Sequence, residues 1–123
     1  MKRYLSGILA VTVAISTVAF TTKGKIFKPY VSYVFHYTGG SYLKTPVETN
    51  GNWAPGSGSG CGSTQNKACQ MQVLSTYTHD DGTGTQVLNT SGNVLSITAV
   101  KGANNTDFVP SASTAISGIN NKP

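Results

Sequence analysis

The stretch YVSYVFHYT, residues 30–38, decides the fold class of this chain. Large apolar side chains recur there at every second position, as Val31, Tyr33, Phe35 and Tyr37. A period of two places these side chains on one face of a β-strand. β-branched and aromatic residues also suit the pleated, half-buried surface of a sheet. The stretch is therefore predicted to be a strand whose apolar face packs into a core.

Other segments of the chain continue this pattern. Gly39 and Gly40 end the first strand, and residues 41–44 are expected to pair back as a short strand. Apolar side chains alternate with polar ones again in residues 70–79 and 94–100. Both segments are therefore predicted to be strands, and the chain is expected to contain mostly β-structure.

Turn residues and two weaker strands complete the predicted domain. Asp81 and Gly82 form the centre of a turn, followed by a short return strand at 85–89. A weak strand is predicted at 106–109. These elements predict a small, single all-β domain at 30–110, with about five or six short strands, sandwich-like or a half-open barrel. Its core is expected to contain the following apolar residues: Val31, Tyr33, Phe35, Tyr37, Trp53, Met71, Val73, Tyr77, Leu95 and Ile97.

The last segment, residues 111–123, is predicted to be a polar tail outside this domain. Its residues are small and polar, and Ile116 and Ile119 are its only large apolar ones. Such a tail either caps the fold or stays loose.

Residues 46–68 form a long irregular segment that contains Cys61, and Cys69, the other cysteine of the chain, follows directly after it. An even number of cysteines in an exported chain favours a disulfide. This bridge would close a loop of about nine residues and contribute about 2.5 kcal/mol through chain entropy. A redox pair and a zinc site are the alternatives, although zinc would need His36 and His79 as further ligands.

Residues 1–19 have the features of a helical secretory signal peptide. Two basic residues precede residues 4–19, which carry no charge. Small residues precede a cleavage position between Ala19 and Phe20. An uncleaved anchor is the alternative, but the apolar run is shorter than the about 20 residues of a spanning helix. We therefore expect export to the periplasm, the cell surface or the medium, with membrane contact only through this peptide.

The net charge of +5 is concentrated near the N-terminus. Lys23, Lys25 and Lys28 lie in a basic lead-in at residues 20–29, directly after the predicted cleavage position. A short basic segment either attracts anionic lipid or polysaccharide or is simply solvated. The chain shows neither a basic helix nor an aromatic-basic motif, so nucleic acid is not an expected partner.

No residue pattern indicates a catalytic centre, a metal site or a cofactor. The four acidic residues, which a polysaccharide-acting enzyme would need as a carboxylate pair, show no characteristic spacing. His36 and His79 also lack one. The aromatic residues are expected mainly in the core, and the alternative is a sugar-stacking surface. Tyr42 and Trp53 are the candidate ligand-facing residues of such a surface.

The quoted strand, an Asn-Trp pair at 52–53, a glycine-serine loop and two cysteines eight positions apart follow one another along the chain. In this order they resemble a family of short exported proteins of unknown function from Bacteroidetes. The resemblance runs from the N-terminus to about Pro110. It implies an exported, envelope-associated protein in which Cys61 and Cys69 act together, and it implies no activity.

The sequence therefore predicts a non-enzymatic binding or structural protein that is secreted or belongs to the envelope. Its expected partner is an envelope protein or a polysaccharide. The first alternative is a small basic secreted effector, antimicrobial or toxin-like, and the second is a polysaccharide-acting enzyme.

Overall fold

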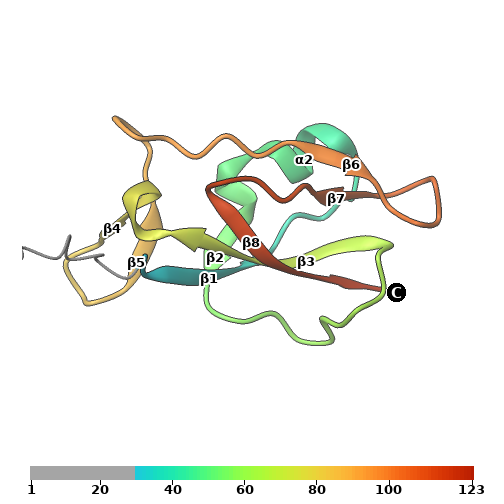
Figure 1. Cartoon of the computed structure of the whole chain (residues 1–123), viewed down its shortest axis with the longest axis horizontal. Helices are drawn as coiled ribbons and strands as arrows, with labels where there is room; N and C mark the ends of the chain where they lie inside the picture. The colour runs from blue at the N-terminus through green and yellow to red at the C-terminus, as the bar shows by residue number, and fades with distance from the viewer. Residues whose placement is uncertain (1–29) are drawn as a thin grey trace, which may run out of the picture.

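The computed structural model describes residues 30–123 (Figure 1). The predicted signal peptide, its cleavage position between Ala19 and Phe20, and the basic lead-in lie outside the described residues. Within 30–123, eight strands and one short α-helix follow one another along the chain. The all-β prediction is confirmed, although the strands outnumber the five or six expected. They form separate sheets that do not close into a barrel.

A four-stranded antiparallel sheet forms the centre of the fold, with strand order β2-β1-β3-β8. The bounds of its strands are Ser32–Tyr37 for β1, Trp53–Pro55 for β2, Lys67–Leu74 for β3 and Ile116–Lys122 for β8. Phe35 in the centre of β1 lies opposite Pro55 on one side and Met71 on the other. The most regular stretch of the sequence therefore occupies the middle of the sheet.

Two hairpins accompany the sheet. They consist of β4 (Thr78–Asp80) with β5 (Gln86–Leu88), and of β6 (Ala99–Lys101) with β7 (Phe108–Pro110). Figure 1 shows β6 and β7 on the same side of the sheet as the helix, and β4 and β5 at one end. The strands of both hairpins are short, so most of the strand residues belong to the four-stranded sheet.

The strand predicted at 30–38 is confirmed as β1. Phe35 is fully buried and Tyr37 is buried, while Tyr33 is partly buried against the core. The prediction for Val31 is wrong, because this side chain is 48% exposed. Val31 precedes β1, beyond the part of the face that the rest of the fold covers.

Residues 41–44 do not form the predicted return strand. The chain instead forms α2 at Lys44–Glu48 and a 3₁₀ turn, η1, at Asn50–Asn52. Pro46 lies in the first turn of α2, where the hydrogen bond that its missing N–H would make is not required. Val47 on this helix is completely buried. The burial of this one side chain, which depends on distant segments, overrides the weak local strand pattern.

The strand predicted at 70–79 is divided in two by a 3₁₀ turn, η2, at Ser75–Tyr77. Met71 and Val73 on β3 are buried on one face, as predicted. Tyr77 lies in the turn and is only partly buried. The return strand predicted after the turn at Asp81 and Gly82 is confirmed as β5, and the weak strand before Pro110 as β7.

Only the end of the segment 94–100 is a strand, because β6 begins at Ala99. The predicted alternation is nevertheless present: Leu95 and Ile97 are buried and their neighbours are exposed. The amide Nδ2 of Asn50 donates to the carbonyl oxygen of Leu95 at 2.8 Å. The side chain of Asn50 therefore bonds a backbone carbonyl that a neighbouring strand would bond in a regular sheet.

The segment predicted as a polar tail contains β8, the longest strand after β3. Ile116 is buried beside Val73, which lies opposite it on β3. The domain therefore continues past the predicted boundary at residue 110, and residues 111–123 are part of it. The strand was not recognised because only Ile116 and Ile119 are large and apolar in this segment.

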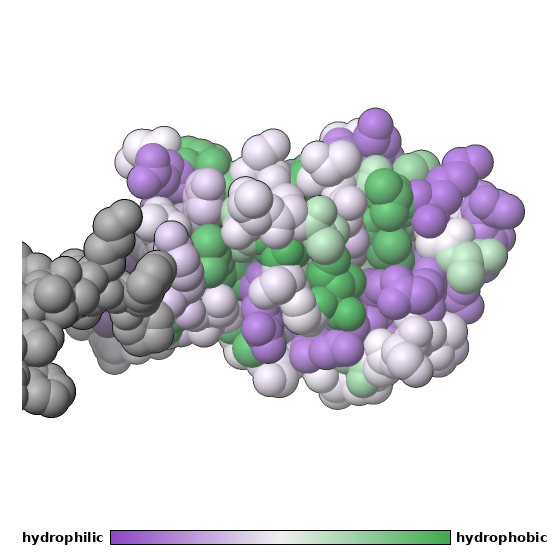
Figure 2. Space-filling view, viewed as in Figure 1, coloured by the Kyte–Doolittle hydropathy of each residue, from purple (hydrophilic) through white to green (hydrophobic). Residues whose placement is uncertain are grey.

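The core lies between the sheet and the short elements that cover it. It also contains residues that the strand pattern did not predict: Val47, Ala68, Leu88, Ala99, Ala115 and Ile116. On the face shown in Figure 2, apolar residues occur in separate small patches among polar ones. This arrangement is usual for the surface of a small folded domain.

Candidate functional site

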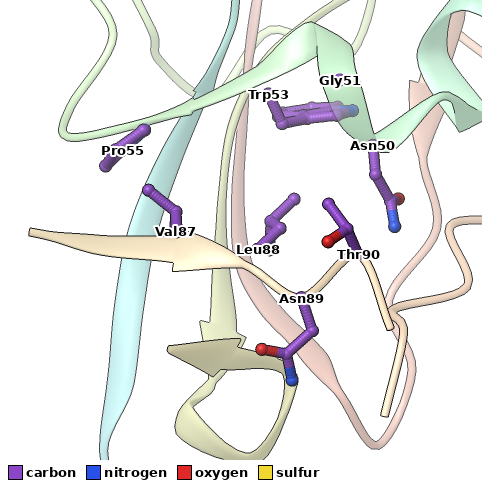
Figure 3. Close-up of a pocket in the computed structure, with 8 residues that line it drawn as sticks. All are labelled: Asn50, Gly51, Trp53, Pro55, Val87, Leu88, Asn89 and Thr90. Atoms are coloured by element: carbon purple, nitrogen blue, oxygen red, sulfur yellow. The ribbon is translucent and has the colours of Figure 1, made fainter. Parts of the chain in front are cut away.

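A hollow of about 180 Å³ lies between β2 and β5. Figure 3 shows the indole of Trp53 on one side of it, with Val87, Leu88 and Thr90 pointing toward that ring from the opposite side. Its wall contains the following residues: Asn50, Gly51, Trp53, Pro55, Val87, Leu88, Asn89 and Thr90. None of these residues carries a charge, so the hollow suits a small, uncharged and largely apolar group.

The indole of Trp53 is fixed in place from two sides. Its Nε1 donates to the carbonyl oxygen of Val47 at 2.9 Å, so that α2 determines the orientation of the ring. Its ring centroid lies 5.1 Å from that of Tyr37, at a tilted angle. The side chain is only 5% exposed. Trp53 is therefore mainly a core residue, and only a small part of it borders the hollow.

The two amides beside the hollow differ in their hydrogen bonds. Nδ2 of Asn50 donates to Leu95, as described above, but Oδ1 of Asn50 is buried and has no partner among the described residues. The side chain of Asn89 points away from the hollow in Figure 3, and its Nδ2 donates to the carbonyl oxygens of Thr76 and Asn93. The hydroxyl of Thr90 lies on the side of the hollow in Figure 3. The wall of the hollow is thus mainly apolar, with the hydroxyl of Thr90 and the amide of Asn50 as side-chain polar groups.

Tyr42, the other expected ligand-facing residue, does not line this hollow. Its ring packs against Tyr37, with centroids 5.5 Å apart, and the Lys67 ammonium lies 5.8 Å from its centroid. Burial and the neighbouring Tyr42 raise the pKa of Tyr37, whose hydroxyl donates to the Ser41 carbonyl. Tyr42 and Trp53 therefore both contact Tyr37, but only Trp53 borders the hollow.

The disulfide between Cys61 and Cys69 is present, with the two Cα atoms 5.5 Å apart. It joins the glycine-rich loop at residues 56–66, named the cover loop below, to β3. The predicted disulfide is therefore confirmed. Within residues 30–123, no group of three or more His, Cys, Asp or Glu side chains could hold a metal.

The cover loop lies along the outer side of β8. Gly62 and Asn121 form an antiparallel pair, in which each backbone N–H donates to the other carbonyl at 2.8 and 3.0 Å. The Nδ2 of Asn121 donates to Oε1 of Gln65, and the backbone oxygen of Gln65 accepts from Ala103. A side chain at Gly102 would overlap with the backbone of the cover loop. The loop is therefore fitted closely to the end of the sheet.

These contacts alone are a weak basis for an ordered loop. Ordering one residue costs about 1–2 kcal/mol, and glycine loses more conformational freedom than other residues. Each hydrogen bond contributes only about 1 kcal/mol net. The cover loop contains glycine at 56, 58, 60 and 62. The disulfide, which contributes about 2.5 kcal/mol by the chain-entropy relation, offsets part of this cost.

The acidic residues accept hydrogen bonds at separate places in the fold. Oε1 of Glu48 accepts from the backbone N–H of Ala99 at 2.9 Å, and Asp107 accepts from Asn104. Asp80 and Asp81 accept from backbone groups of the β4–β5 turn. Hydrogen bonds from Thr83 lower the pKa of Asp81 below its ordinary value. None of these carboxylates lines the hollow.

Neither the hollow nor its wall was predicted. Residues 85–89 were recognised as a strand, and Trp53 was recognised as an anchor, but the pattern does not place β5 beside β2. That neighbourhood depends on η2, which turns the chain between β3 and β4. A local sequence pattern carries little information about such a turn.

No protein-family model, curated protein or solved structure matches this chain. In residues 30–123, no helix has the length and apolar character needed to cross a membrane. Membership of this chain in the family of short exported Bacteroidetes proteins therefore stays a prediction from the sequence, and so does the signal peptide.

Proposed function

We propose that this chain is exported and acts outside the cytoplasm as a non-enzymatic binding or structural protein, secreted or in the envelope. The observation that carries the proposal is the disulfide between Cys61 and Cys69. Such bonds persist in oxidising compartments and are rare in the cytosol. The charge and hydropathy of residues 1–19 support the same location.

The hollow beside Trp53 is the proposed contact site. Its volume of about 180 Å³ is smaller than a typical ligand pocket of about 300–1,000 Å³. It therefore suits one apolar side chain of an envelope protein, or one sugar ring of a polysaccharide, rather than a whole small molecule. The fixed position of the indole favours binding, because a preorganised site loses little freedom on association.

The charge distribution favours this proposal over a basic effector. Residues 30–123 carry four lysines and four carboxylates, so the net charge of the chain comes entirely from the first 29 residues. A basic effector would have to depend on the lead-in at 20–29. A neutral domain instead suits a partner recognised by shape and apolar contact.

The location is tested by the intact mass of the protein recovered from medium and envelope fractions, with thiol alkylation before and after reduction. We expect the loss of residues 1–19 and labelling of Cys61 and Cys69 only after reduction. A full-length mass, or thiols that react without reduction, would overturn the exported location.

The contact site is tested by filling the hollow. Thr90→Phe adds an aromatic ring at the rim, whereas Thr83→Phe adds the same ring at the tip of the β4–β5 hairpin. Retention on isolated envelope and on its purified polysaccharide is measured for both variants and the native chain. We expect only Thr90→Phe to reduce retention. Equal retention of all three proteins would exclude the hollow as the contact site.

A further inference from the structure

The dipeptide Asn50-Gly51, at the start of η1, places a side-chain amide next to the backbone nitrogen of a glycine. It is the only place in the sequence where glycine follows asparagine. An asparagine amide loses ammonia when the backbone nitrogen of the next residue attacks its Cγ atom. Glycine favours this attack, because it lacks a Cβ atom and adopts the widest range of backbone conformations. Residue 50 is therefore a candidate site of spontaneous modification.

The backbone nitrogen of Gly51 is available for this reaction. Gly51 is exposed, and the structure leaves open space where a Cβ atom would lie. The next two N–H groups are bonded within the turn, from Asn52 to the Thr49 carbonyl and from Trp53 to the Asn50 carbonyl. Among the described residues, the N–H of Gly51 has no such acceptor. The attacking nitrogen thus lies at the surface and is not engaged in a hydrogen bond.

The side-chain amide of Asn50 is held by one hydrogen bond. Its Nδ2 donates to the carbonyl oxygen of Leu95 at 2.8 Å, whereas its Oδ1 has no partner among the described residues. Asn89, on the same wall of the hollow, instead uses both Oδ1 and Nδ2 in hydrogen bonds. A single hydrogen bond contributes little net free energy, so it opens often on the timescale of slow covalent chemistry. The fold therefore slows the attack on Asn50 but does not prevent it.

The reaction balances with water as its co-reactant. A bond forms between the nitrogen of Gly51 and Cγ of Asn50, and the bond from Cγ to Nδ2 breaks. The proton of the Gly51 N–H leaves with Nδ2 as ammonia, and a cyclic succinimide remains. Water then opens the ring, with its hydroxyl added to a carbonyl carbon and its proton to the nitrogen. Opening at Cγ gives aspartate, and opening at the backbone carbonyl gives isoaspartate.

Both products replace the amide with a carboxylate. In the aspartate product, an oxygen takes the place of Nδ2 and faces the carbonyl oxygen of Leu95, so that two acceptors meet. Asn50 also lines the hollow, whose wall otherwise has no charged side chain. A carboxylate there must lose hydration when an apolar group enters, and this loss costs free energy. The modified hollow should therefore reject an uncharged partner.

We propose that Asn50 is a site of spontaneous deamidation, and that the resulting carboxylate closes the hollow to its uncharged partner. The modification itself depends on Asn50, Gly51 and Leu95, whereas its effect on binding rests on the proposed function of the hollow. Because the chain does not reverse the reaction, the proportion of modified protein increases with the age of the exported chain.

The modification is tested by incubating the folded full chain in mildly alkaline buffer and mapping its peptides by mass spectrometry. We expect a rise of one mass unit at Asn50, with aspartate and isoaspartate products. Asn93 is the internal control, because it is exposed and precedes Val94, whose stiff β-branched side chain hinders the attack. Deamidation at Asn50 that is no faster than at Asn93 would overturn the proposal.

Gly51→Ala identifies the attacking nitrogen, because the added methyl group meets open space and the fold is kept. It should slow deamidation at Asn50 by about tenfold or more, since alanine adopts fewer of the backbone conformations that the attack requires. Trp53 fluorescence checks the fold of the variant, because this indole is buried in the native chain. An unchanged rate in the folded variant would also overturn the proposal.

The effect on the hollow is tested with Asn50→Asp, which has the chemical structure of the aspartate product. Asn93→Asp is the matched control, because it adds the same charge at an exposed residue outside the wall of the hollow. We expect Asn50→Asp alone to lower the melting temperature, through the contact with Leu95, and to reduce retention on isolated envelope. Equal melting temperatures of the two variants, or exposure of the Trp53 indole in Asn50→Asp, would contradict closing of an intact hollow.

Retention separates this inference from the proposed function. If Thr90→Phe reduces retention and Asn50→Asp does not, the hollow binds its partner but the carboxylate does not close it. If neither variant reduces retention, the proposed function fails and the closing of the hollow fails with it. The deamidation rates at Asn50 in the native chain and in Gly51→Ala decide on the modification in either case.

Discussion

Strand β1 and the cover loop lie close to the same central strand, β3, but different forces hold them. β1 is fixed by side chains that alternate along its length, with Phe35 and Tyr37 buried in the core. The cover loop has glycine at every second position from 56 to 62 and is fixed by one disulfide and a few hydrogen bonds. The comparison teaches that order in this chain has two sources, namely apolar burial and covalent or polar ties.

The largest expected effect comes from removing burial at β1. Phe35→Ala deletes a ring that is completely buried in the centre of the sheet. Loss of the ring and formation of a cavity should lower the free energy of unfolding by about 3–5 kcal/mol. Urea denaturation measures this change. The control Tyr30→Ala removes a side chain that is 84% exposed, and it should have an effect within about 0.5 kcal/mol.

A smaller effect is expected from breaking the tie of the cover loop. Cys61→Ser/Cys69→Ser should lower the free energy of unfolding by about 2.5 kcal/mol, because the unfolded chain gains freedom. Hydrogen exchange should accelerate at residues 56–66 and stay slow at β1. Uniform acceleration in both regions would show that the two are not held independently. Ser63→Ala, beside the bridge, is the matched control.

A polar tie of the cover loop should have a still smaller effect. Gln65→Ala removes the acceptor for Nδ2 of Asn121, a residue that is 0% exposed. A buried donor without a partner costs about 1–3 kcal/mol, and Oδ1 of the same amide already lacks one among the described residues. Thermal unfolding measures the loss. Thr64→Ala changes an exposed neighbour and should leave the melting temperature unchanged.

The smallest effect is expected at the β4–β5 turn, which neither buried side chains nor the disulfide hold. The pKa of Asp81 is lowered by bonds from Thr83, so the folded state favours the charged form. Its stabilising contribution is present above the unfolded pKa of about 4, and it is lost as the pH falls through the lower folded pKa. Asp81→Asn should therefore flatten the dependence of stability on pH below about pH 4. An unchanged acid profile in thermal unfolding would contradict this prediction.

The comparison also explains which parts of the structure the sequence predicts. Alternation identified β1 and the buried face of β3, because burial of Phe35, Met71 and Val73 acts through a local period. The disulfide was predicted from the count of cysteines. In contrast, α2 depends on the burial of Val47 against distant segments, and β8 has few apolar residues. The hollow requires β2 and β5 to be neighbours. The alternation of apolar residues within one segment does not predict which strands lie beside each other.

The position of β8 in the chain has a consequence for the timing of folding. β8 pairs with β3, the strand at the centre of the sheet, yet it lies more than forty residues later in the sequence. During synthesis, β3 therefore lacks this neighbour until residues 116–122 have been made. The four-stranded sheet can be completed only after all the other described strands have been synthesised.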